Sequence, residues 1–97
     1  MSQDKQSLVV KRVPIDSVVP DAANARIHGP RNVEAIRNSL RQFGQVEPLL
    51  VQRGTSRLIA GHGRLEAMRL NGVTEVDVVE LDVSDIAATN LNIALNR

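Results

Sequence analysis

The stretch that decides the fold is residues 57–66, which read Arg-Leu-Ile-Ala-Gly-His-Gly-Arg-Leu-Glu. Its first part is apolar and typical of a buried strand, and Gly61-His62-Gly63-Arg64 follows as a turn into a helix. We expect that helix from about Arg64 to Asn71. Two glycines allow the backbone to turn sharply and to approach a ligand closely. The stretch therefore predicts a domain that mixes strands with helices.

The hydrophobic pattern predicts further elements on both sides of this stretch. We expect, in chain order, a strand at 8–13, a single helical turn at 14–20, a loop at 21–30, a helix at 31–43, a β-hairpin of strands 48–53 and 57–60, the helix of 64–71, a strand at 75–81 and a last helix after Ser84. The predicted fold is a small α+β (mixed α/β) domain with a mixed sheet of about four strands and about three helices. Residues 1–7 are expected to be a flexible N-terminus and residues 8–97 the domain.

The spacing of apolar residues also predicts which face of each helix is buried. The expected inward-facing residues are Val33, Ile36, Leu40 and Phe43 in the first helix, Leu65, Met68 and Leu70 in the second, and Ala87, Leu91, Ala94 and Leu95 in the third. Gly44 and Gly72 are expected to end the first two helices, and Ser84 to cap the third.

The composition excludes several classes of protein. The 97 residues include no Cys, so disulfides, thiolate metal sites and cysteine nucleophiles are excluded. The absence of Trp and Tyr removes the stacking platforms of single-strand nucleic-acid binders. No apolar run approaches the roughly 18 residues of a membrane span, and the polar start Met1–Ser7 does not resemble a signal peptide. We therefore expect a soluble cytoplasmic protein.

The charges are unevenly distributed along the chain. Residues 1–72 hold eleven basic and six acidic residues, whereas residues 73–97 hold one and five. Ten of the twelve cations are Arg, which suits forked contacts with phosphate or carboxylate. The net charge of +1 does not by itself indicate nucleic acid, but the first part of the chain has the residues for a local anion site.

The turn at residues 61–64 has two interpretations. In one, a phosphate or carboxylate binds at Gly61, His62, Gly63 and Arg64, because the first N–H groups of a helix lack intrahelical partners and an anion would offset the unfavourable position of Arg64 near the positive end of the dipole. In the other, the turn is an ordinary connection, with Arg64 solvated and His62 at the surface. A short glycine-rich turn is a weak motif by itself, so both interpretations remain. No spacing resembles a metal-ligand set, and no metal site is predicted.

Four other residues are candidates, each with a structural alternative. Arg26 could reach the same anion or be a loop arginine. Glu47, in a helix-to-strand loop, could be a general base or metal ligand or be merely solvated. Asn92 and Asn96 are poor helix formers four residues apart, so they could serve a ligand or a buried polar contact, or belong to a weak terminal helix.

Four motifs follow one another along the chain: Asn24-Ala25-Arg26-Ile27-His28, Leu40-Arg41-Gln42-Phe43-Gly44, Glu47-Pro48-Leu49-Leu50-Val51 and Leu58 to Ala67. Their order resembles that of the ParB/sulfiredoxin-like superfamily, and most closely that of its ParB-like N-terminal domain branch. The resemblance covers about residues 9–97. The Gly-His-Gly-Arg version is similar to domains found with DNA methyltransferases and in mobile-element proteins.

The resemblance implies a nucleotide-binding domain in a DNA-associated role such as segregation, modification or mobile-element function. Gly61, His62, Gly63 and Arg64 would bind the phosphates, Arg26 and Asn96 would be accessory, and Glu47 would be the catalytic candidate. The nucleotide would be CTP or ATP, with Mg²⁺ in the segregation members. The resemblance leaves open whether the domain also catalyses NTP hydrolysis or phosphoryl transfer. Sulfiredoxin chemistry is excluded because the chain has no Cys. A homodimer and DNA contact through a neighbouring domain are also implied.

Two alternatives from other classes remain at this point. The first is a DNA-backbone-binding or nuclease-like accessory domain, whose phosphate contacts would come from Arg31, Arg37, Arg41, Arg57 and Arg69. The second is a degenerate protein-interaction module, which would bind no small ligand and would associate through an exposed apolar face of the last helix.

Overall fold

The computed structural model describes residues 8–21 and 30–95 and confirms the predicted order of elements. The elements are β1 (Val10–Pro14), the 3-10 turn η1 (Ile15–Ser17), α1 (Pro30–Phe43), β2 (Leu49–Gln52), β3 (Leu58–Ala60), α2 (His62–Leu70), β4 (Glu75–Leu81) and α3 (Asp85–Leu95). None of the helices in these two ranges is long and apolar enough to span a bilayer.

The four described strands form one mixed sheet in the order β1-β4-β2-β3. β1 and β4 are antiparallel, as are β2 and β3, whereas β2 and β4 are parallel. The chain passes from β2 to β4 through β3 and α2. In the strand order, β4 lies inside the sheet and β3 at its edge. Next to that edge, Val19 forms an isolated parallel β-bridge with Arg57, the residue before β3. The predicted mixed sheet is therefore confirmed.

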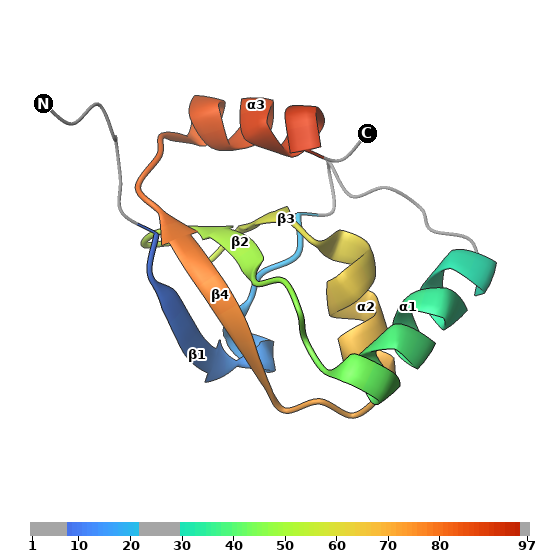
Figure 1. Ribbon diagram of the computed structural model, residues 1–97. Coiled ribbons are helices and arrows are strands. Elements are labelled where there is room, and N and C mark those ends of the chain that lie inside the picture. Colours follow the sequence, from blue (N-terminus) through green and yellow to red (C-terminus); the bar gives the residue numbers. More distant parts are fainter. Residues whose placement is uncertain (1–7, 22–29, 96–97) are drawn as a thin grey trace, which may run out of the picture.

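The main core lies between α2, η1 and one face of the sheet. Its fully buried side chains include Leu49 and Leu58 from the hairpin, Met68 from α2, and Val76 and Val78 from β4. In Figure 1, α1 lies beside α2, and α3 lies apart from both, next to β3. Because side chains alternate along a strand, the other sheet face carries Ile59 and Val79, which are also buried.

Two of the predicted inward-facing residues in α1 and α2 are exposed instead. Phe43 is 66% exposed and Leu70 is 56% exposed. At about 100° per residue, Phe43 lies at the edge of the stripe begun by Val33, and Leu70 lies on the side opposite Met68. Both are also at the last residue of their helix, where the chain leaves the core. The prediction for these two positions was wrong.

The buried face of α3 also differs from the prediction. Ala88 and Asn92 are the buried residues of this helix, whereas Ala94 and Leu95, which were expected to face inward, are exposed. Asn92 explains the rotation, because its amide donates a hydrogen bond to the Ile59 carbonyl at 3.0 Å and so satisfies a buried polar group. The predicted cap at Ser84 is confirmed by the hydrogen bond from the Ala87 N–H to its Oγ at 3.1 Å.

The first strand is shorter than predicted at its start. β1 begins at Val10, and Leu8 and Val9 precede it with exposed fractions of 68% and 64%. Val10 and Val79 form the last pair of the β1–β4 ladder, and Leu8 and Val9 are not paired although β4 continues to Leu81. The helix ends at Gly44 and Gly72 are as predicted, with the Gly44 N–H donating to Leu40 O at 2.8 Å.

Candidate functional site

The turn between β3 and α2 is built around Gly61. The helix begins at His62, two residues earlier than predicted, and Gly61 is its N-cap with φ of 108°. A Cβ at Gly61 would lie 2.5 Å from Leu49 Cδ2, which is in the core. Gly61 is thus required by backbone conformation and by packing. Gly63 lies inside the helix, so the expectation that both glycines form the turn was wrong.

His62 and Gly63 form the first turn of α2 and are buried. His62 is 8% exposed, which contradicts its interpretation as a surface residue. The first intrahelical bond is from the Leu65 N–H to Gly61 O at 2.8 Å, so the N–H groups of Gly63 and Arg64 have no intrahelical acceptor. Gly61 contributes no side-chain cap. The positive end of the α2 dipole is therefore at this turn.

Arg64 and Glu47, which are 17 residues apart in the sequence, form an ion pair in the structure. Arg64 Nη1 and Glu47 Oε1 are 3.2 Å apart. The side chains are 30% and 68% exposed, and an ion pair this accessible contributes only about 0–1 kcal/mol. The structure thus brings together two of the predicted site residues, through a contact that an incoming anion can displace at little cost.

The Arg64 guanidinium lies over the start of its own helix. Its Nη2 would be 3.2 Å from a Cβ at Gly61, and its Nε 3.6 Å from the same position. The Nε atom is buried and has no hydrogen-bond partner within residues 8–21 and 30–95. A buried guanidinium N–H without an acceptor costs free energy, so an anion that accepts from Arg64 Nε–H would be stabilised. The helix dipole also favours negative charge at this position.

The loop that carries Glu47 is held in place by Gln45, a residue that the sequence did not single out. The Gln45 amide donates to Asp77 O at 2.9 Å and to Glu47 O at 3.0 Å, and it accepts from the Asp77 N–H at 2.8 Å. These bonds attach the loop to β4 and bring Glu47 against α2. The residues next to Gln45 in the sequence do not distinguish it from a glutamine that is exposed in a loop. The sequence therefore gives no indication that Gln45 attaches this loop to β4.

A cavity of about 340 Å³ adjoins the ion pair. It lies between α1 and the loop before β2, with Arg64 and Glu47 at its polar rim and Ile36, Leu40 and Val46 among its apolar lining residues. This volume is at the lower end of the range for small-molecule sites. The cavity and the α2 N-terminus share Arg64, so a ligand can contact both.

The other predicted residues either lie away from this turn or belong to the part of the chain that the structure does not describe. Arg26 and Asn96 lie outside the described residues, as does the side chain of Arg31. The described arginines proposed for a DNA backbone each have a hydrogen bond or ion pair within the protein, and they are Arg37, Arg41, Arg57 and Arg69. No group of three or more His, Asp and Glu side chains that could hold a metal ion occurs in the described part of the chain.

Comparison with known proteins supplies the family. The model of the ParB N-terminal domain matches residues 1–96. The chain belongs to the ParB N-terminal domain family. Among its relatives, the ParB-like nuclease domain-containing protein YnaK of Escherichia coli is 35% identical over 68 residues, which are 70% of this chain and 77% of YnaK.

The partitioning relatives of this ParB N-terminal domain are longer proteins. A probable plasmid-partitioning protein ParB of Thermus thermophilus is 34% identical over 99 residues, covering 95% of this chain but 31% of that protein. The chain thus spans most of YnaK and about a third of the partitioning protein.

Solved structures show the same fold. The chromosome-partitioning protein ParB of Caulobacter crescentus, complexed with CTP-gamma-S, superposes with a TM-score of 0.79 at 23% identity, over 92% of this chain and 54% of that one. Sulfiredoxin from Arabidopsis thaliana superposes with a TM-score of 0.73 at 16% identity, over 86% of this chain and 96% of that one. The predicted ParB/sulfiredoxin-like fold is therefore confirmed.

Proposed function

We propose that this ParB N-terminal domain binds a nucleoside triphosphate, with the phosphates at Gly61, His62, Gly63 and Arg64. The observation that carries the proposal is the Arg64 guanidinium, which lies over the α2 N-terminus with a buried Nε that has no acceptor in the described part. A phosphate oxygen would supply that acceptor and would also accept from the N–H groups at the helix start. Arg26 and Asn96 are proposed as accessory residues on the strength of the family resemblance.

Glu47 is the proposed catalytic residue. Its carboxylate is exposed and lies 3.2 Å from Arg64, so a phosphate bound by Arg64 would lie near it. Mg²⁺ in nucleotide sites is usually held by one or two carboxylates together with the substrate phosphates. Glu47 fits that requirement and would hold a Mg²⁺ ion that arrives with the nucleotide, where the ion would neutralise phosphate charge. With the ion in place, Glu47 would support NTP hydrolysis or phosphoryl transfer.

The choice of nucleotide and the biological role draw on the relatives. The Caulobacter protein was solved with CTP-gamma-S, and another structure of it is described as complexed to the centromeric parS site. CTP is therefore the first nucleotide to test, ahead of ATP. A DNA-associated role in segregation, modification or a mobile element is proposed, with DNA contacts made through a neighbouring domain or protein.

Calorimetric titration of the domain with CTP, ATP and GTP, with and without Mg²⁺, tests the proposal. We expect saturable binding of at least one nucleotide by the wild type, and loss of about tenfold or more in affinity for Arg64→Ala, because a charged hydrogen bond contributes about 1.5–3 kcal/mol. Arg69→Ala is the matched control, since Arg69 lies at the other end of α2 and carries the same charge. It should bind like the wild type.

Three results would contradict the binding proposal, and a fourth would contradict the catalytic role of Glu47. Absence of binding by the wild type to any nucleotide would refute it, and an equal loss in Arg64→Ala and Arg69→Ala would reduce it to a general charge effect. Salt-sensitive DNA binding that is indifferent to nucleotide would favour the DNA-backbone alternative. For catalysis, phosphate release by Glu47→Gln at the wild-type rate would remove Glu47 from that role.

A further inference from the structure

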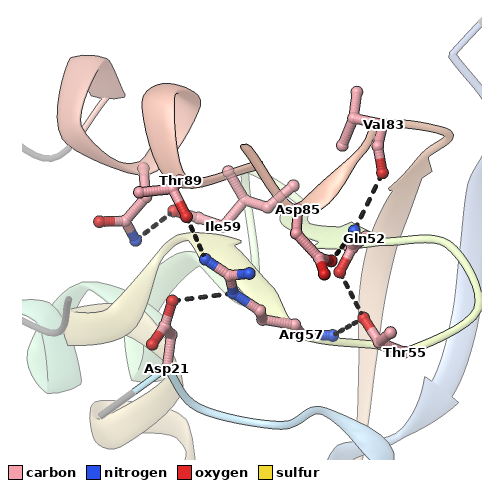
Figure 2. Close-up of polar contacts among 9 residues, drawn as sticks. Asp21, Gln52, Thr55, Arg57, Ile59, Val83, Asp85 and Thr89 are labelled. Carbon is pink, nitrogen blue, oxygen red and sulfur yellow. Dashed lines mark hydrogen bonds and ion pairs between the residues drawn. The ribbon is translucent and has the colours of Figure 1, made fainter. Parts of the chain in front are cut away.

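Helix α3 contacts the sheet region through two polar side chains as well as through the buried Ala88. Asn92 is 3% exposed and donates from Nδ2 to the Ile59 carbonyl at 3.0 Å. One turn earlier, the Thr89 hydroxyl accepts a hydrogen bond from Arg57 Nη2 at 2.8 Å. Figure 2 shows Arg57 between Thr89 and Asp21, to which its Nε donates at 2.8 Å. Residues three apart share a helix face, so Thr89 and Asn92 present one polar edge to β3.

Three of the four large apolar side chains of α3 point away from the protein, and the fourth, Leu91, is half-buried. Ile86 is 76% exposed, Ile93 is 63% exposed and Leu95 is 51% exposed. Apart from Asn92, Ala88 is the one buried residue of this helix. Ala88 and Leu91 supply apolar contacts, but apolar packing is non-directional. The directional bonds of Asn92 and Thr89 therefore fix the position of α3 against the sheet.

One of these bonds is to the Ile59 carbonyl in β3, and the other is to the side chain of Arg57, the residue before β3. Strand β3 leads into the proposed phosphate turn. Ile59 is two residues before Gly61, and β3 is an edge strand of only three residues. Gly61 lies close to the core, since a Cβ at this position would be 2.5 Å from Leu49 Cδ2. The path of β3 therefore sets where the N–H groups at the start of α2 point, and α3 is the helix that packs on β3.

We propose that Asn92 and Thr89 are positioning residues for the phosphate turn, with α3 fixing β3 and thereby the placement of Gly61 and Gly63. The inference rests on the proposed function for its effect on ligand affinity, but its geometric part is independent of any ligand. Removal of either bond shifts the turn while the core formed by β2, β4 and α2 stays intact, because that core includes no α3 residue.

The test compares Thr89→Val, which keeps the shape and removes the hydroxyl, with Thr89→Ser, which keeps the hydroxyl. Asn92→Leu removes the second bond. The control is Arg37→Lys. The Arg37 side chain is 28% exposed, and its Nε donates a hydrogen bond to Asn71 Oδ1 at 2.7 Å. This bond resembles that of Arg57 but does not involve β3. Two quantities are measured: affinity for inorganic tripolyphosphate, and the amide chemical shifts of Gly61 and Gly63 in the ligand-free protein.

Thr89→Val and Asn92→Leu are expected to shift both glycine amides and to weaken tripolyphosphate binding by roughly threefold to tenfold. Thr89→Ser and Arg37→Lys should leave both quantities as in the wild type. Unchanged glycine amides in Thr89→Val would overturn the inference, as would an equal loss of affinity in Arg37→Lys. If the wild type binds no tripolyphosphate, the proposed function fails, and the ligand-free glycine amides still decide whether α3 positions the turn.

Discussion

Replacement of Gly61 by alanine should destabilise the domain more than replacement of any other described glycine with a positive φ, because a Cβ would meet nothing within 4 Å at the other three. The variant has two costs. Holding an L-residue at φ of 108° costs about 1–2 kcal/mol. The new Cβ would also lie 2.5 Å from Leu49 Cδ2, and relieving such overpacking typically costs about 1–3 kcal/mol. Together these predict a loss of about 2–5 kcal/mol from a domain whose total stability is about 5–15 kcal/mol.

Gly54→Ala is the matched control for the conformational cost. Gly54 has φ of 90°, and a Cβ there would have nothing within 4 Å. This variant should therefore lose only the conformational cost of an L-residue at positive φ, about 1–2 kcal/mol of stability. The difference between the two variants measures the contacts of the new Cβ, of which the one with Leu49 is the closest and the one with the flexible Arg64 side chain the next.

Urea unfolding followed by far-ultraviolet circular dichroism measures both variants, since the chain has no Trp or Tyr for intrinsic fluorescence. For a domain of this size, each kcal/mol also lowers Tm by about 4–8 °C. If Gly61→Ala loses no more stability than Gly54→Ala, the close approach to Leu49 does not restrict the turn, and the packing argument for Gly61 is refuted.

Three further variants test other contacts. Ser84→Ala should lose about 1 kcal/mol in urea unfolding, because the cap to the Ala87 N–H is removed; a loss of zero would mean that the cap is not formed in solution. Gln52→Leu should lose about 1–3 kcal/mol, because the buried amide that donates to Val83 O at 2.9 Å is removed, and a gain in stability would contradict this account. Phe43→Ser should change stability by less than about 0.5 kcal/mol, since Phe43 is 66% exposed; a loss above 2 kcal/mol would instead support the predicted inward position.

The order of elements was predictable because local signals mark it. The strand-to-helix turn at Gly61, the cap at Ser84 and the apolar pattern of β4 each depend on residues close in sequence. The rotation of α3 was not predictable in this way. Its buried face includes Asn92, which hydrophobic periodicity places outside, and the Ile59 carbonyl that satisfies it lies 33 residues away.

The candidate site was predictable in part. Gly61 and Arg64 carry their own signals, a glycine at a turn and a cation at the wrong end of a helix dipole. The ion pair of Arg64 with Glu47 has no local signal, because it depends on the bonds of Gln45 to Asp77, 32 residues further along the chain. Long-range contacts of this kind decide which candidates come together.

The most direct test of the central claim is a nuclear magnetic resonance titration of the isotope-labelled wild type with CTP and Mg²⁺. The account predicts saturable shifts that are largest at the Gly63 and Arg64 amides and at the Arg64 side-chain Nε–H, whose hydrogen has no acceptor in the described part of the chain. Shifts that fail to saturate, or that centre on residues away from the start of α2, would contradict it.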